Sequence, residues 1–161
     1  MLKLKIFAVM IFLLVLPGLA VAANQGRVVG VSDGDTITVL TPDKAQIKVR
    51  LYGIDCPESK QAFGNRAKQA TSDAVFGKQV TLVIMDTDRY GRSVAIVRYD
   101  GLVLQETLLK AGMAWVYDKY CKPGTPCNDW RQMQKEARAN RIGLWRDKNP
   151  VPPWEWRRAP R

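Results

Sequence analysis

Five charged residues, in three separate parts of the chain, have the side chains needed for phosphodiester cleavage without histidine. The protein contains no histidine, which excludes Ser–His and Cys–His nucleophile systems and histidine-ligated zinc sites. Hydrolysis would then depend on carboxylates, which bind hard cations or accept protons, and on arginines, which bind phosphate oxygens in a bidentate manner. The five residues are Asp35, Arg50, Asp55, Glu58 and Arg92.

The middle segment, Val49 to Ser59, combines the pattern of a buried strand with charged residues at its exit. Arg50 interrupts the apolar run, and Asp55 and Glu58 follow it. Because Pro57 restricts the backbone just before Glu58, the Glu58 carboxylate could be aimed at a water beside a metal and act as a general base. We therefore expect this strand to deliver a phosphate-binding arginine, a metal ligand and a base.

The remaining roles follow from the charge of a phosphodiester transition state. Arg50 and Arg92 can bind the equatorial oxygens over which that charge spreads. Asp35 and Asp55, with a backbone carbonyl and waters, can hold a divalent cation, and such a loose oxygen sphere suits Ca²⁺ better than Mg²⁺. Each cluster also has a simpler interpretation, since Asp-Gly-Asp (33–35) is typical of a turn and one arginine in a strand can form a structural ion pair.

Hydrophobic periodicity predicts the elements that would position these residues. Strands are expected at 27–31, 36–40, 47–54, 80–85 and 94–99, and Asp100-Gly101 predicts a hairpin turn into 102–103. Helices are expected from Phe63 to near Gly77, from Leu104 to Gly112, and after Asn128 as N-cap, with Trp130, Met133 and Ala137 on one face. Short antiparallel strands with interspersed helices predict an α+β protein, a five-stranded OB-fold barrel with about three helices.

The N-terminus has the pattern of a secretory leader. Two lysines precede an apolar run at 6–16, and a small-residue A-x-A pattern follows at 20–22, which predicts a signal peptide at 1–22. The run is too short for a stable membrane span, although an uncleaved anchor is the alternative. We expect one domain at 23–161 with a Pro/Trp-rich C-terminal tail over its surface. The mature protein would be a monomer, periplasmic or secreted, without stable membrane insertion.

Cysteine spacing and net charge fit an exported protein that meets polyanions. Cys121 and Cys127 flank the turn-forming sequence KPGTP, so a disulfide is predicted in an oxidising compartment, with two free thiols as the alternative. The formal net charge is +10, which favours nucleic acid first and anionic envelope polymers second. The basic residues are scattered, so charge alone does not identify the partner.

The segments DGDT, RLYGIDCPE and DRYGRSVA resemble, in order and spacing, the motifs of the staphylococcal nuclease (thermonuclease) family. The resemblance runs from about Gly30 to Trp145. It implies an OB-type barrel and Ca²⁺-dependent hydrolysis of both DNA and RNA, with little sugar specificity and 3′-phosphate products. On this basis we predict a secreted calcium-dependent endonuclease, with DNA and RNA as substrates and Ca²⁺ as cofactor.

The resemblance also implies a role for each matched position. The catalytic residues are Arg50 and Arg92, which bind phosphate, and Glu58, the general base. The calcium ligands are Asp35, Asp55 and the backbone carbonyl of Cys56, with Asp33 as an outer-shell acid. The residues that contact a terminal phosphate of the substrate are Arg89 and Tyr90.

Two departures from the family pattern affect these roles. Cys56 replaces a threonine of the type member, but a carbonyl ligand does not need a particular side chain, so we expect calcium binding to survive. The segment between Glu58 and Phe63 is shorter than in the type member, which bears on substrate affinity. The tyrosine that would stack on a base is Tyr117 or Tyr120, and the sequence does not choose between them.

Two other functions fit parts of the sequence. An OB module could bind nucleic acid through its basic surface without cleaving it, and an exported basic protein could bind anionic envelope polymers. Neither function requires the particular carboxylates and arginines of the three motifs. Their joint presence therefore favours hydrolysis.

Overall fold

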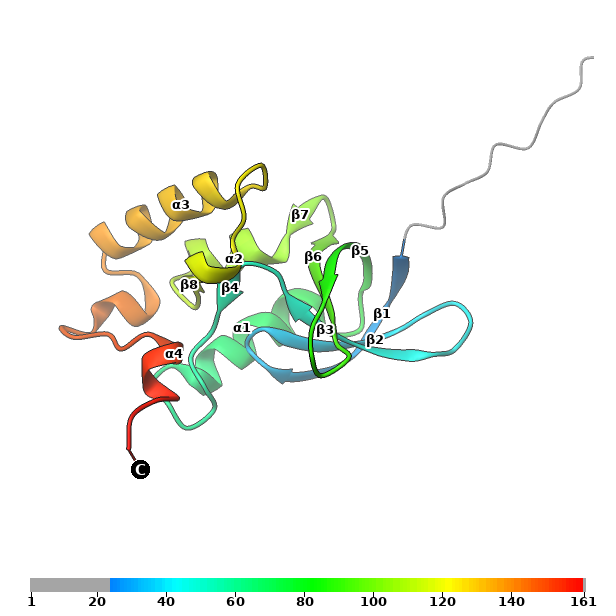
Figure 1. The fold of residues 1–161 in the computed structure, drawn as a ribbon, viewed down its shortest axis with the longest axis horizontal. Coiled ribbons are helices and arrows are strands. Elements are labelled where there is room, and N and C mark those ends of the chain that lie inside the picture. Colours follow the sequence, from blue (N-terminus) through cyan, green and yellow to red (C-terminus); the bar gives the residue numbers. More distant parts are fainter. Residues whose placement is uncertain (1–23, 161) are drawn as a thin grey trace, which may run out of the picture.

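The computed structural model describes residues 24–160, and the leader predicted at 1–22 lies outside this range. Its main feature is a closed barrel of five strands (Figure 1). These strands are β1 (Asn24–Asp33), β2 (Thr36–Leu40), β3 (Gln46–Leu51), β5 (Gln79–Thr87) and β6 (Ser93–Tyr99). The short β7 (Leu102–Val103) folds back after the two-residue turn and pairs antiparallel with the end of β6. The predicted α+β fold with a five-stranded barrel is confirmed.

The barrel closes through a pairing that the strand patterns did not predict. Neighbouring strands are antiparallel throughout the order β3-β2-β1-β5-β6, as expected. The closing pair, β3 with β6, is parallel and brings Arg50 opposite Val94. Because β2 also pairs Thr36 with Arg50, the arginine sits on a strand that is held from both sides.

The strand predicted at 47–54 is wrong at its end, because the chain turns before residue 54. β3 stops early, and a separate β4 (Ile54–Asp55) pairs with β8 (Trp115–Val116). Gly53 between them has φ +70°, and a Cβ there would lie 2.9 Å from the sulfur of Cys121. Only glycine fits this conformation and this close approach without strain. The break moves Asp55 out of the barrel sheet.

Four helices and two 3₁₀ turns lie within the described residues, and most of them follow the barrel strands in the sequence. They are α1 (Gly64–Val75), α2 (Leu104–Lys110), α3 (Cys127–Ala139) and α4 (Pro153–Trp156), with 3₁₀ turns η1 (Asp118–Tyr120) and η2 (Gly143–Arg146). The predicted N-cap of α3 is wrong: the helix begins at Cys127 after Pro126, and Asn128 already lies in its first turn. There its side chain accepts a hydrogen bond from Arg131 at 2.8 Å. Within residues 24–160, no helix combines the length and apolar character that crossing a membrane requires.

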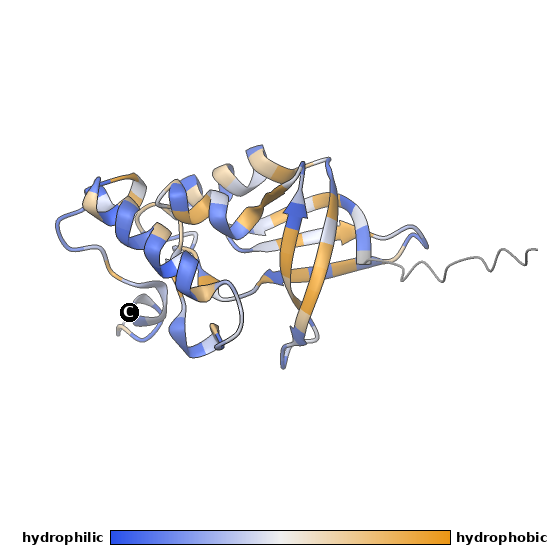
Figure 2. Cartoon of the chain, turned by 90° about the horizontal axis from the view of Figure 1, so that it is seen from above, coloured by the Kyte–Doolittle hydropathy of each residue, from blue (hydrophilic) through white to orange (hydrophobic). Residues whose placement is uncertain are grey.

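The core has two parts. The larger one fills the barrel and the space under α1, α2 and α3, and Figure 2 shows most of the hydrophobic colour on the barrel strands. The smaller one joins Trp115, Ala137, Leu144 and Trp145, with Trp154 of α4 packed against it. The tail predicted to lie over the surface is thus tied into the protein by burial of Trp145 and partial burial of Trp154, whereas Trp156 is exposed.

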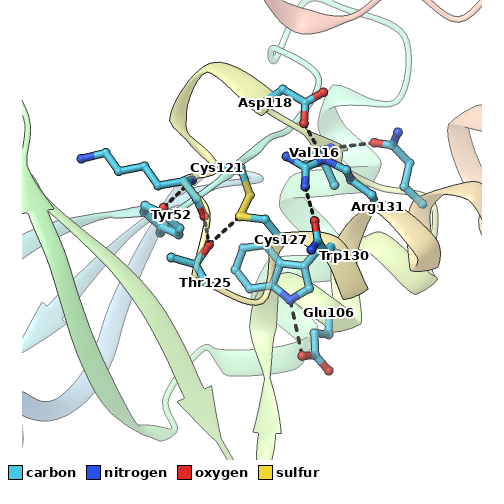
Figure 3. The surroundings of a disulfide bond; sticks show 12 residues. Tyr52, Glu106, Val116, Asp118, Cys121, Thr125, Cys127, Trp130 and Arg131 are labelled. Atoms are coloured by element: carbon cyan, nitrogen blue, oxygen red, sulfur yellow. Dashed lines mark hydrogen bonds and ion pairs between the residues drawn. A yellow bond between two sulfur atoms is a disulfide. The ribbon is translucent and has the colours of Figure 1, made fainter.

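A disulfide between Cys121 and Cys127, with Cα atoms 5.7 Å apart, closes the loop that leads into α3 (Figure 3). A hydrogen bond links this loop to the residue that follows β3: the backbone amide of Lys122 donates to the Tyr52 hydroxyl at 2.9 Å. The disulfide also lies against the buried ring of Trp130, which is 0% exposed. This arrangement fixes the segment that follows β8.

Candidate active site

Two buried carboxylates at one end of the barrel share a single guanidinium. Asp35 is 2% exposed and Asp55 is 0% exposed. The Nη1 atom of Arg50 forms an ion pair with Oδ1 of Asp35, and its Nη2 atom lies 2.6 Å from Oδ1 of Asp55. The backbone N–H of Cys56 donates to Oδ2 of Asp35 at 2.7 Å. The fold therefore brings together the three predicted residues Asp35, Arg50 and Asp55.

A tight turn positions Asp35. The Asp33 carboxylate accepts a hydrogen bond from the backbone N–H of Asp35 at 3.1 Å, which stabilises the turn. At Gly34, a Cβ would lie 2.7 Å from Cβ of Cys56 and 2.8 Å from Cβ of Ala67. Glycine thus lets the turn approach the segment after β4 closely. Asp33 shapes the backbone here, whereas its predicted outer-shell role stays a prediction.

Glu58 lies on a compact turn between β4 and α1. Its backbone carbonyl accepts a hydrogen bond from the N–H of Gln61 at 2.8 Å, and the Gln61 side chain accepts one from the N–H of Glu58 at 3.1 Å. A Cβ on Gly64 would collide with this carbonyl. The Glu58 side chain is 38% exposed, so the packed backbone presents a carboxylate that water can reach.

Arg92 lies at the rim of the same site, just before β6. Its Nε atom is 2.7 Å from Oδ2 of Asp88, and its Nη1 atom is 3.5 Å from Oγ1 of Thr36. That hydroxyl lies 3.4 Å from Oδ1 of Asp35, so Thr36 links Arg92 to the buried carboxylates. Desolvation of Asp88 is outweighed by hydrogen bonds from Arg92 and Tyr90, and the pKa of Asp88 is lowered.

Arg89 and Tyr90 lie beside Arg92 and have no contact with the buried carboxylates. Arg89 donates to the Tyr90 hydroxyl at 2.6 Å. The guanidiniums of Arg89 and Arg92 lie 4.8 and 5.5 Å from the centroid of the Tyr90 ring. Tyr90 is 68% exposed. This loop offers an exposed cationic and aromatic surface next to the rim.

Cys56 is buried and chemically quiet. Its thiol is 3% exposed, and burial raises the pKa of Cys56 well above its ordinary value. A protonated, buried thiol is a poor nucleophile. The backbone N–H of Cys56 contacts Asp35, whereas calcium binding by its carbonyl stays a prediction.

The structure adds Arg157, which the sequence did not point to. Its Nη2 atom lies 2.7 Å from Oδ2 of Asp55, and its Nη1 atom lies 2.6 Å from Oε1 of Glu58. Hydrogen bonds to these carboxylates outweigh desolvation and raise the pKa of Arg157. Because 99 residues separate Arg157 from Glu58, no local spacing could reveal the contact.

The donor chemistry of Asp35 and Asp55 fits a hard cation. One guanidinium already bridges the two carboxylates, so both can contact a single positive charge. Oxygen ligands of this kind suit Ca²⁺. Among residues 24–160, however, no group of three or more His, Cys, Asp and Glu side chains is arranged around a metal position. Backbone carbonyl oxygens and waters would therefore have to complete the coordination.

The fold and the site define an OB-type barrel protein with buried carboxylates and arginines gathered at one rim. A sequence model of the family described as "Staphylococcal nuclease homologue" matches residues 48–147. The chain belongs to this nuclease family. The match begins within β3 and continues through η2, and it includes Arg50, Asp55, Glu58 and Arg92.

Related bacterial proteins are similar over most of their length. An "Uncharacterized endonuclease" of Haemophilus influenzae is 41% identical over 156 residues, covering 97% of this chain and 85% of that protein. The "Micrococcal nuclease" of Shigella flexneri is 44% identical over 144 residues, covering 84% and 81%. "Protein ParB" of Escherichia coli is 40% identical over 154 residues, covering 90% and 85%. The likeness therefore extends beyond the core motifs.

Proposed function

We propose that this chain is an exported, calcium-dependent endonuclease that hydrolyses DNA and RNA with little sugar specificity and leaves 3′-phosphate ends. The observation that carries the proposal is the pair of buried carboxylates, Asp35 and Asp55, bridged by Arg50, with Arg92 and Glu58 at the same rim. The names of the relatives and the net charge of +10 support a nucleic-acid substrate.

In this proposal, Asp35, Asp55 and the carbonyl of Cys56 hold the metal. A bound Ca²⁺ supplies positive charge that polarises a phosphoryl oxygen. The positions of the two aspartates are preorganised for this task because the close approach at Gly34 and the pairing of β4 with β8 fix their backbone. Preorganised charge contributes to rate since little rearrangement is needed during the reaction.

The arginines bind and stabilise the phosphate. Arg50 has five N–H donors, and its position on β3 between β2 and β6 fixes its backbone. Arg92 is oriented by its ion pair with Asp88. Planar guanidiniums on two sides of a phosphate would hold it in one orientation and stabilise the charge of the transition state.

Glu58 accepts the proton of the attacking water. Its half-exposed side chain can be reached by solvent, while the turn with Gln61 fixes its backbone. The water oxygen bonds to phosphorus, the bond from phosphorus to the 5′-oxygen breaks, and the leaving oxygen takes up a proton. The products are a 3′-phosphate and a 5′-hydroxyl.

Digestion of end-labelled DNA and RNA in Ca²⁺, Mg²⁺ or EGTA tests this function. We expect cleavage in Ca²⁺, none in EGTA, and labelled 3′ ends that lose phosphate on treatment with a phosphatase. Arg92→Ala should cleave far more slowly, because it lacks a phosphate-binding guanidinium. Arg98→Ala is its matched control, because Arg98 is an exposed arginine of β6, the strand that begins just after Arg92. Full cleavage in EGTA by purified protein would reject the metal dependence.

Export is proposed on the leader pattern at 1–22 alone. Expression of the full chain in a Gram-negative host, followed by N-terminal sequencing of the periplasmic fraction, tests it. We expect a mature chain that begins near Ala23. A full-length protein retained in the cytoplasm or the membrane would contradict export.

A further inference from the structure

Asp55 is contacted by two guanidiniums that come from different parts of the protein. The Nη2 atom of Arg50, on β3, lies 2.6 Å from Oδ1 of Asp55. Arg157, just after α4, lies 2.7 Å from the other oxygen and 3.3 Å from the first. The second nitrogen contact of Arg157, at 2.6 Å, goes to Glu58. Arg157, in the C-terminal segment (residues 151–160), thus contacts both the predicted metal ligand and the predicted base.

Several contacts hold the C-terminal segment in this position. The ring of Trp154 stacks on Tyr117, with centroids 4.8 Å apart and planes within 6°, and packs edge-on against Trp115 at 5.8 Å. The carbonyl of Val151 accepts a hydrogen bond from the side chain of Gln61 at 2.6 Å. Figure 1 shows α4 beside the loop that follows β4. Arg157 is therefore delivered to the site by a docked segment.

A divalent cation cannot bind Asp55 while Arg157 keeps its present contacts with that carboxylate. Both oxygens of Asp55 already accept contacts from guanidiniums, and a divalent ion needs those same oxygens. An ion beside a guanidinium is also repelled by it, most strongly where water is excluded. Arg157 is the more easily displaced partner, because its side chain is 38% exposed whereas that of Arg50 is 20% exposed and the backbone of Arg50 is paired on both sides.

We propose that Arg157 is a further residue of the metal site, which forms ion pairs with Asp55 and Glu58 and is displaced when a divalent cation binds. The inference rests on the proposed metal site. Displacement removes the ion pair that occupies Glu58, and so leaves its carboxylate available to accept a proton. It also breaks the contact between Arg157 and the site, so cation binding removes one of the contacts that hold the C-terminal segment.

Calcium titration by isothermal calorimetry tests the competition. The full chain is compared with Arg157→Gln, Arg157→Lys and the control Arg158→Gln, since Arg158 is the neighbouring exposed arginine. Charge-assisted hydrogen bonds contribute enough that their loss should raise Ca²⁺ affinity about tenfold in Arg157→Gln. Lysine keeps the charge but cannot bridge two carboxylates, so Arg157→Lys should fall in between, and Arg158→Gln should match the unaltered protein.

Hydrogen exchange on the unaltered chain gives a second readout that does not depend on a variant. The amides of Trp156 and Arg157 donate to the carbonyls of Pro152 and Pro153 at 3.0 Å. We expect Ca²⁺ to speed exchange in 153–160 while it protects the segment around Asp55. Unchanged or slower exchange in 153–160 on Ca²⁺ binding would overturn the inference.

The outcomes separate this inference from the proposed function. If the unaltered protein binds Ca²⁺ but Arg157→Gln binds it equally or more weakly, Arg157 does not compete and the proposed nuclease site stands. If the unaltered protein binds no Ca²⁺ at millimolar concentration, the metal site itself is refuted and this inference falls with it. Circular dichroism of each variant establishes that its fold is retained.

Discussion

Arg50 and Arg157 contact the same carboxylate but are held in different ways. Arg50 lies on a strand paired on both sides, and its guanidinium also binds the buried Asp35. Arg157 follows a four-residue helix that docks through aromatic rings, and its side chain is more exposed. The barrel therefore fixes the geometry of the site, whereas the C-terminal segment supplies a contact that can be released.

The difference in burial between Arg50 and Arg157 also predicts that loss of Arg50 destabilises the fold more than loss of Arg157. Removing one partner of a buried ion pair is strongly destabilising, because it leaves an uncompensated charge. Arg50 bridges two buried carboxylates, so its removal would leave both of them without their shared partner. Arg157 is partly solvated, so water can replace more of what it contributes.

The largest effect is expected for Arg50→Ala. Loss of the phosphate-binding guanidinium should lower turnover by about 10³-fold. Because Asp35 and Asp55 would lose their shared partner, the free energy of unfolding in EGTA should fall by about 3–5 kcal/mol. Rapid-quench kinetics and urea unfolding measure the two effects. Lys48→Ala, an exposed position on the same strand, is the control, and near-normal turnover of Arg50→Ala would remove Arg50 from the site.

Glu58→Gln should change activity without changing the fold. The amide keeps the shape of the side chain but cannot accept a proton, so turnover should fall by about 10²-fold or more. The acidic limb of the pH–rate profile should also disappear. Thermal unfolding checks that the turn with Gln61 is kept. A profile identical to that of the unaltered enzyme would show that Glu58 is not the base.

Gly64→Ala separates local preference from tertiary contact. At the first residue of α1, alanine is the better helix former by about 1 kcal/mol, which would predict stabilisation. In the structure its Cβ would collide with the carbonyl of Glu58, and such overpacking costs about 1–3 kcal/mol. We expect a net loss of stability and a drop in turnover. A more stable, fully active variant would mean that the turn at Glu58 can move enough to accommodate the added Cβ.

The smallest effect is expected for Asp88→Asn, which changes the ion-pair partner of Arg92. The pKa of Asp88 is lowered because hydrogen bonds from the backbone N–H and side chain of Arg92 and from the backbone N–H of Tyr90 outweigh desolvation, so these contacts add stability above the carboxyl's ordinary pKa of about 4. That stability is lost as the pH falls through the lower, folded-state pKa. In Asp88→Asn, the loss of stability between pH 4 and pH 2 should be slightly smaller. Asp129→Asn, exposed on α3, is the control, and identical acid unfolding of all three proteins would contradict the assignment.

Local patterns predicted the barrel well and its closure poorly. The β-branched run at 36–40 marked β2 with its observed bounds, and Asp100-Gly101 marked the hairpin. The parallel pairing of β3 with β6 could not be predicted, because alternation describes one strand and does not name its partner. The turn at Gly53 was missed since it depends on the disulfide and on Trp130, which lie far along the chain.

The candidate site shows the same division. Asp35, Arg50 and Asp55 were singled out because their types suit phosphate chemistry, and the structure brings them into direct contact. The docked position of Arg157 was missed, because a Pro/Trp-rich tail has no periodicity that points to its partners. The contact arises from the stacking of Trp154 on Tyr117, a tertiary feature without a local signal.

A crystal structure of the protein with Ca²⁺ and a short uncleavable oligonucleotide would test the central claim most directly. Our account predicts one ion on the carboxylates of Asp35 and Asp55, Arg50 and Arg92 on the phosphate beside it, and Arg157 turned away. An ion bound elsewhere, or a phosphate remote from both arginines, would contradict it.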